Sequence, residues 1–400
     1  MSHPHTLVKA MANKMTPKNS LKKIFQQLHL YIGLLFSLIF LIVCISGMLL
    51  SFEKELTPLL WPKEQRVAVL ENRLPVDVIV SGAKNFFPDK RLFRLEIPAD
   101  RSRSYRVQYG SKKEKYWYAY INPYTGEVLS KGPQAERFFQ KVLDIHRFLL
   151  MDKIGATLTG ISALATLFLA ISGIYLWWPK NRQLLKQRLK VGMSASMKRK
   201  VWDFHAVGGF YAALFLLIFT LTGLTWSSDW YNKQFFRLFG ADNKTKKEKV
   251  KNPVSELAVG FSPFETMYQQ INALYPAPGN ILMTFPEQED IAFSLTKESF
   301  SGGLLQINQA YFDSRSGKLI KGNPMNKLPV AEQMRKMVKP IHVGSVFGLP
   351  SKIVMFLAAS LAATLPITGL WIWLNKRNKK MVRPRKKRRP RDRAVPLNLP

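Results

Sequence analysis

Four long stretches of this chain carry almost no charge, and they limit its fold more than any other feature. They are residues 24–52, 154–178, 204–228 and 353–374. Each is long enough to cross a bilayer, since a membrane-spanning helix needs about 20 apolar residues. The mean hydropathy of −0.07 hides this segregation, because polar segments lie between the stretches. The sequence therefore predicts a mainly α-helical membrane protein, a four-helix transmembrane bundle with two hydrophilic inserts.

The predicted organisation follows from these boundaries. We expect the first stretch to be a retained span and not a cleaved signal peptide, because it is too long and no small-residue cleavage site follows it. The segments are a basic arm (1–23), span 1 (24–52), an insert (53–145), span 2 with a helical lead-in (146–178), a basic loop (179–203), span 3 (204–228), a second insert (229–341), span 4 with a lead-in (342–374) and a basic tail (375–400).

The net charge of +34 is concentrated at span ends on one predicted side of the membrane. The arm holds five lysines, the loop 179–201 holds eight basic residues and no acid, and the tail holds twelve basic residues and one acid. Short loops rich in Lys and Arg stay in the cytoplasm. We therefore expect both termini in the cytoplasm and both inserts outside it. The basic termini favour anionic lipid headgroups over nucleic acid as partners.

Four of the six histidines precede a Gly that follows Ser or Thr, at one of two spacings along the sequence. The pairs are His29 with Gly47 and His205 with Gly223, 18 residues apart, and His146 with Gly173 and His342 with Gly369, 27 residues apart. Two spacings, each found twice in the same order, indicate an internal repeat. Each half then reads as a span, an outer insert and a returning span.

The inserts carry the repeat as well. The segment YINPYTGEVLSKG (120–132) matches YFDSRSGKLIKG (311–322), and polar turn residues before a Gly predict a β-hairpin in both. Alternating segments such as RLFRLEI, YRVQY and IAFSLT predict further strands. We therefore expect two small α+β extracytoplasmic domains, each ending just before an outer histidine.

Topology sets the predicted depth of the histidines. His29 and His205 stand at the start of spans that run outward, so they share the inner level. His146 and His342 precede spans that run back inward, so they share the outer level. Eighteen helical residues cover ~27 Å, whereas 27 would cover ~40 Å, which exceeds the hydrocarbon core. We therefore expect a bend near Asp152 and near Gly348. Each bend would separate a span from the lead-in helix that carries the outer histidine.

Each level then offers two imidazoles, one from each half of the chain. Helical bundles build haem and metal sites from side chains on facing helices, and two imidazoles on one porphyrin make a six-coordinate electron-transfer haem. We predict two bis-histidine b-type haems, an inner one at His29 and His205 and an outer one at His146 and His342. A proton relay would need an acid at mid-depth and zinc three or four ligands, and the spans offer neither.

Glycines near these histidines are expected to make room for the macrocycles. Gly33 and Gly209 each follow an inner histidine by four residues and therefore share its helix face. The glycines of the Ser-Gly and Thr-Gly pairs are expected to make room for the other haem in the same manner. Tryptophans at the span ends, Trp177 among them, are expected to form an interfacial belt.

Five groups of residues together resemble a known family. They are LHLYIGL (28–34) with SGMLLSFEKEL (46–56), INPYTGEVL (121–129), DIHRFLL (144–150) with ISGIYLWWP (171–179), DFHAVGGFY (203–211) with LTGLTW (221–226), and IHVGSVFG (341–348) with ITGLWIW (367–373). Over residues 21 to about 377 the chain resembles the PepSY-associated transmembrane proteins, often described as iron-regulated inner-membrane proteins. The hairpins resemble the end of a PepSY module.

The resemblance implies that His29, His146, His205 and His342 bind haem. It also implies a bacterial inner membrane and electron transfer from the cytoplasmic side to an extracytoplasmic ferric chelate of siderophore type, which would release Fe(II) for uptake. No G-x-G-x-x-G motif opens a helix after a strand, so we expect a separate protein or a quinol as the electron donor. The sequence identifies no catalytic residue.

Two other functions fit the same sequence. A quinol-linked cytochrome of the b561 type would have the same haem sites and a different acceptor. A haem-free envelope protein would instead use its PepSY-like inserts to bind or restrain an extracytoplasmic protease. The second insert matches a PepSY module only at its hairpin, so its role is not assigned.

Overall fold

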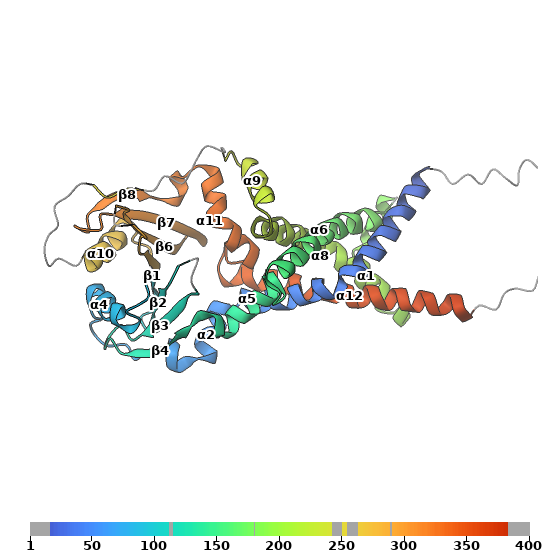
Figure 1. Ribbon diagram of the computed structural model, residues 1–400. Helices are drawn as coiled ribbons and strands as arrows, with labels where there is room; N and C mark the ends of the chain where they lie inside the picture. Colours follow the sequence, from blue (N-terminus) through green and yellow to red (C-terminus); the bar gives the residue numbers. More distant parts are fainter. Residues whose placement is uncertain are drawn as a thin grey trace, which may run out of the picture.

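The structure is a computed structural model that describes residues 17–111, 115–179, 181–241, 250–253, 263–288 and 290–382. A bundle of long helices carries a β-sheet at one end (Figure 1). The described chain begins and ends at the opposite end of the bundle (Figure 1). Residues 1–16 of the basic arm and 383–400 of the basic tail lie outside the described residues, so their predicted contact with lipid stays a prediction.

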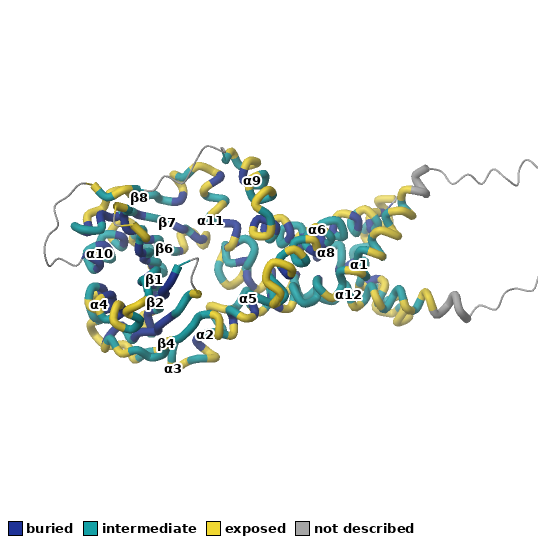
Figure 2. The backbone as a smooth tube through the Cα atoms, in the orientation of Figure 1, coloured by how far each residue is buried: buried dark blue, intermediate teal, exposed yellow. Residues whose placement is uncertain are grey.

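Four helices among the described residues are long and apolar enough to cross a membrane. They are α1 (Pro17–Ser51), α6 (Asp152–Trp177), α8 (Met197–Ser227) and α12 (Leu349–Val382). Large apolar side chains such as Leu35 and Leu214 are exposed, which suits lipid better than water. Exposed positions recur along the bundle (Figure 2). Small buried residues, Ala170, Ala212 and Ala362, let the helices approach one another closely. The four predicted spans are present as helices.

Shorter helices connect these spans to the sheet or cover it. They are α2 (Glu53–Leu60), α3 (Pro62–Gln65), α4 (Val76–Phe86), α5 (Phe138–Phe148), α7 (Leu185–Arg188), α9 (Asp229–Arg237), α10 (Phe264–Leu274) and α11 (Val330–Val343), with 3₁₀ turns η1 (Gln134–Glu136), η2 (Arg182–Leu184) and η3 (Met325–Lys327). The amphipathic α4 and α10 bury one face each against the sheet, where Ile79 and Met267 are inaccessible to solvent.

The helix ends shortly after His146 and again after His342, as the spacing predicted. Helix α5 ends before α6 begins at Asp152, and α11 ends before α12 begins. Residues with positive φ make both breaks: Leu149, Leu150 and Asp152 in the first, Gly344 and Gly348 in the second. A left-handed conformation costs a non-glycine residue roughly 1 kcal/mol, so the first joint holds backbone strain that the glycines of the second avoid.

The strands of both inserts join in one antiparallel sheet. They are β1 (Leu92–Ile97), β2 (Tyr105–Tyr109), β3 (Trp117–Ile121), β4 (Val128–Pro133), β5 (Gly279–Thr284), β6 (Phe293–Ser301), β7 (Leu304–Phe312) and β8 (Leu319–Asn323). Their order is β4-β3-β2-β1-β5-β6-β7-β8, so β1 pairs with β5 across the seam between the inserts. This differs from the two separate domains predicted: pairing β1 with β5 satisfies backbone groups that two isolated sheets would leave as open edges. The two predicted hairpins, β3–β4 and β7–β8, are confirmed.

The two faces of the sheet have different neighbours. Helices α4 and α10 cover one face, where Leu95, Val107 and Leu295 are buried in the core. Side chains alternate along a strand, so Arg94 and Arg106 project from the opposite face. That face looks toward the bundle, where α2, α5 and α11 approach it (Figure 1).

Helices α4 and α10 also cap each other across the seam. Asp77 accepts hydrogen bonds from the N–H groups of Phe264 and Glu265 at 2.8 and 3.1 Å, and Glu265 accepts one from the N–H of Val76 at 2.8 Å. Arg73 donates two hydrogen bonds to Glu265, at 3.0 and 2.7 Å. Burial tends to raise the pKa of Glu265, but Arg73 and the Val76 N–H outweigh it, so the pKa lies below its usual value.

Replacing Glu265 should weaken this seam in a pH-dependent way. We expect Glu265→Gln to reduce the free energy of unfolding by about 1–3 kcal/mol at neutral pH, because it removes a charged acceptor. The carboxylate contributes above its unfolded pKa near 4.5, and its contribution is lost as the pH falls through the lower folded value. The difference between wild type and variant should therefore shrink below that pH.

Denaturant unfolding in detergent across this pH range measures the effect. Glu127→Gln, in the exposed β3–β4 turn, is the matched control and should leave the free energy of unfolding nearly unchanged. A loss at Glu265 that is the same at every pH would contradict the assignment.

Candidate functional site

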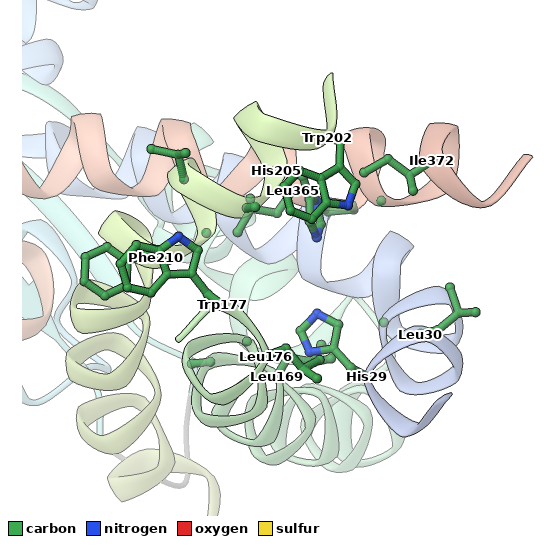
Figure 3. A pocket seen from close by; sticks show the side chains of 18 of the residues that line it. His29, Leu30, Leu169, Leu176, Trp177, Trp202, His205, Phe210, Leu365 and Ile372 are labelled. Carbon is green, nitrogen blue, oxygen red and sulfur yellow. The ribbon is translucent and has the colours of Figure 1, made fainter. Parts of the chain in front are cut away.

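A cavity of about 700 Å³ lies in the bundle at the end remote from the sheet. His29 of α1 and His205 of α8 project into it from opposite sides (Figure 3). Gly33 and Gly209, one helical turn further along, also line it, so the structure brings the four residues predicted for the inner site together. We call His29 and His205 the sheet-distal pair. The volume is that of a typical pocket for a small organic ligand or cofactor.

Basic side chains form part of the lining of this cavity. Lys22, Arg188, Lys190 and Arg199 line it, and Asp203 is the single acid among its lining residues. Arg199 and Asp203 form a salt bridge at 2.7 Å. The other three cations give the lining a net positive charge, which favours a ligand with negatively charged groups.

Trp177 forms part of the cavity wall and does not join the predicted interfacial belt. It is buried, and its ring stacks on that of Phe210 with the centroids 3.7 Å apart. Its Nε1 donates to the carbonyl of Arg188 at 3.3 Å, and the Arg188 guanidinium donates back to the carbonyl of Trp177. The segment after α6 folds back over the helix end and buries the ring. The position of Trp177 at the end of an apolar stretch does not predict this contact, because hydropathy does not indicate where the following segment packs.

His146 of α5 and His342 of α11 face each other at the sheet end, and we call them the sheet-side pair. Their ring centroids are 6.3 Å apart. A metal–imidazole bond of about 2.0 Å, with about 1.2 Å from nitrogen to ring centre, would separate two imidazoles on opposite sides of one metal by about 6.4 Å. The observed separation would therefore allow both imidazoles to bind a single metal. Phe219 and Trp226 pack edge-on against His342.

Burial favours the neutral form of the sheet-side imidazoles. Burial, together with charge repulsion from His146, lowers the pKa of His342 to about 3. Burial also lowers the pKa of His146, although a hydrogen bond to the Val43 carbonyl opposes the shift. A neutral imidazole keeps one nitrogen lone pair, which is what a metal ligand requires.

All four histidines contact a hydroxyl group, and the sequence alone did not predict these contacts. The distances from Nδ1 to the hydroxyl oxygen are 2.8 Å for His29 with Ser172, 3.2 Å for His146 with Ser46, 2.9 Å for His205 with Thr368 and 2.8 Å for His342 with Thr222. Each contact joins two helices of the same half of the chain: α1 with α6 or α5, and α8 with α12 or α11. The hydroxyls belong to the Ser-Gly and Thr-Gly pairs of the repeat.

The glycines of these pairs lie against the imidazole rings. The sequence predicts that these glycines make room for a macrocycle, whereas the structure places a histidine from a neighbouring helix there. A Cβ would lie 3.0, 3.4, 3.3 and 3.2 Å from Cε1 of that histidine at Gly47, Gly173, Gly223 and Gly369 respectively. A side chain at Gly47, Gly223 or Gly369 would therefore press on a ring edge, and one at Gly173 would be in contact with the ring. Helix packing sets this contact, and spacing along one helix does not reveal it.

Comparison with known proteins gives one family match. Residues 26–376 match the family model described as PepSY-associated TM region. The match covers most of the chain and contains all four histidines with their Ser-Gly or Thr-Gly partners. A search of curated proteins found no match.

The joint after His146 leaves no space for a side chain at Gly155. A Cβ there would overlap the carbonyl oxygen of Phe148. We expect Gly155→Ala to separate α5 from α6 and to lower stability by more than about 3 kcal/mol. Gly160→Ala is the control in the same helix, because its Cβ would lie 3.4 Å from Ser227. Thermal unfolding in detergent compares the two, and equal melting temperatures would contradict the packing described.

Proposed function

This chain belongs to the PepSY-associated TM family, and from that membership we propose that it is a di-haem b-type membrane cytochrome that reduces an extracytoplasmic ferric chelate. The observation that carries the proposal is the arrangement of four histidines in two facing pairs. Each pair takes one histidine from each half of the chain, and each ring is held from a neighbouring helix. We also propose that the halves are structural repeats with PepSY-like inserts.

Different observations at the two pairs support a bis-histidine haem. The sheet-distal pair lines a cavity of about 700 Å³ whose basic lining residues would suit the two propionates. The 6.3 Å separation of the sheet-side rings would allow His146 and His342 to hold one iron. When bound, haem would supply one-electron redox chemistry at each level. His29, His205, His146 and His342 are the proposed iron ligands, and Gly33 and Gly209 the proposed contacts beside the inner macrocycle.

The direction of electron transfer follows from the proposed orientation. Basic segments flank the sheet-distal ends of the spans, so we place that end and both termini in the cytoplasm and the sheet outside the inner membrane. A separate protein or a quinol would then donate electrons near the sheet-distal pair. The sheet-side pair would lie nearest to the acceptor, because α5 follows β4 and α11 follows β8 after one short 3₁₀ turn each.

The bundle-facing side of the sheet favours an anionic acceptor. The Nε atoms of Arg94 and Arg106 are buried and make no hydrogen bond to any described residue. Arg106 Nη1 lies 3.4 Å from a carboxylate oxygen of Glu96. Buried donors without partners are rare in proteins, and ligand oxygens would satisfy these. A siderophore-type ferric chelate offers such oxygens, and reduction weakens its hold because hard oxygen ligands bind Fe(II) less well than Fe(III).

The spectra of four single variants test the haem assignment. We expect His29→Ala and His205→Ala to remove the same haem, and His146→Ala and His342→Ala to remove the other, because each pair shares one iron. Reduced-minus-oxidised absorption spectra of the purified proteins measure this, with His3→Ala as the control outside the spans. Loss in any other pairing would contradict the two-site arrangement, and absence of a Soret band in wild type would favour a haem-free envelope protein.

The acceptor is tested at the sheet. We expect Arg94→Gln and Arg106→Gln to raise the KM for an anionic ferric chelate roughly tenfold each, the value of a lost charge-assisted hydrogen bond. Haem spectra should not change. Lys84→Gln is the control and should leave the KM unchanged, because Lys84 is an exposed residue of α4 on the other side of the sheet. Unchanged KM values in both arginine variants would place the acceptor elsewhere. Reduction of another acceptor, with no reduction of ferric chelates, would favour the quinol-linked cytochrome.

A further inference from the structure

The Ser-Gly and Thr-Gly pairs give the protein a way to fix each imidazole before any cofactor binds. A neutral imidazole carries its proton on either Nδ1 or Nε2, and only a bare Nε2 can ligate a metal while Nδ1 faces the protein. In all four contacts the hydroxyl meets Nδ1. The question is which of the two groups donates.

The hydroxyl protons are already committed to backbone carbonyls. Each hydroxyl donates to a carbonyl of its own helix one turn earlier: Ser46 to Ile42 at 2.7 Å, Ser172 to Leu169 at 3.3 Å, Thr222 to Ile218 at 2.5 Å and Thr368 to Thr364 at 2.9 Å. A hydroxyl has one proton. Its oxygen therefore accepts from the ring, and Nδ1 must be the donor.

A second contact gives the same proton position at His146. Its Nδ1 lies 3.0 Å from the carbonyl oxygen of Val43, which can only accept a hydrogen bond. The proton is therefore on Nδ1, and Nε2 carries the lone pair. The four hydroxyl contacts share this geometry, so the same tautomer follows at every histidine.

We propose that Ser46, Ser172, Thr222 and Thr368, each with its following glycine, are positioning residues that fix the Nδ1–H tautomer and the ring orientation of the four histidines. The hydroxyl sets which nitrogen is bare, and the glycine leaves the space against Cε1 that lets the ring approach the helix. An acceptor at Nδ1 also makes the imidazole a stronger electron donor to iron. The role toward iron rests on the proposed function, whereas the tautomer does not.

The histidines differ in how far they depend on the hydroxyl. His146 keeps Val43 as a second acceptor. For His29 the described residues provide one Nδ1 partner, Ser172. Removal of the Ser172 hydroxyl should therefore free His29, whereas removal of the Ser46 hydroxyl should leave His146 in place. A general loss of packing would not produce this order.

The test compares Ser172→Ala, Ser46→Ala and Ser172→Thr in the full-length protein. We expect Ser172→Ala to weaken retention of one haem by tenfold or more and to raise its midpoint potential. Ser172→Thr should restore both properties, and Ser46→Ala should change them much less. Thr157→Ala is the control, because it removes a hydroxyl bonded to the carbonyl one turn earlier in the same helix with no histidine contact. Equal effects of Ser172→Ala and Ser46→Ala on retention and potential, or no effect of either, would overturn the proposal.

A measurement without haem separates this proposal from the proposed function. Nitrogen NMR of the histidine rings, in protein purified from haem-deficient cells, should show Nδ1 protonated and Nε2 bare at all four positions. In Ser172→Ala the signal of one ring should change to a mixture of tautomers. A protonated Nε2 in wild type would overturn the tautomer assignment even if haem binds. If the protein never binds haem, the proposed function fails and these ring signals still decide the present proposal.

Discussion

The hydrogen bond between an imidazole and a hydroxyl on the next helix is the interaction on which the rest of this structure depends. A polar ring among apolar helices needs a partner inside the protein, because lipid offers none. Serine and threonine can supply one inside a helix, since their own proton returns to the backbone one turn earlier. The remaining lone pair then faces the neighbouring helix. Four such bonds fix the rings, the helix pairs that carry them and the glycine beside each ring.

The sheet extends this arrangement beyond the spans. Pairing β1 with β5 joins the two inserts, and α5 and α11 lead from the sheet to the sheet-side histidines. Lys352, at the start of α12, holds Glu55 of α2 at 2.7 and 2.9 Å, and Lys54 reaches Glu298 of β6 at 3.1 Å. Spans and sheet are therefore connected through charged contacts as well as through the chain. In the proposed function this connection keeps the acceptor surface in register with the sheet-side pair.

The sequence predicted the features that depend on local pattern. Uninterrupted apolar stretches gave the four spans, the 27-residue spacing gave the breaks after His146 and His342, and turn residues gave both hairpins. The two-level grouping of histidines also agrees with the structure, where His146 faces His342 and His29 shares a cavity with His205. These features repeat along the chain, and a repeat is visible without knowledge of the packing.

The features that the sequence did not predict depend on contacts between distant segments. Nothing in the β1 segment indicates that its free edge will pair with β5, because strand pairing between inserts is a matter of register in space. The sequence predicted open space beside Gly47 and Gly173, but it did not predict that an imidazole ring from another helix occupies that space. The sequence predicted that Trp177 is an interfacial residue, but in the structure Arg188 contacts its ring nitrogen and the side chain is buried. Sequence periodicity describes one helix or strand at a time, whereas each of these contacts joins two separate segments.

The haem content of the purified protein tests whether both histidine pairs bind haem. After expression with ample haem supply, the ratio of haem b to protein chain should be two, and the oxidised protein should show the low-spin signals of bis-imidazole iron by electron paramagnetic resonance. A ratio near zero, or high-spin five-coordinate iron at both levels, would contradict the account.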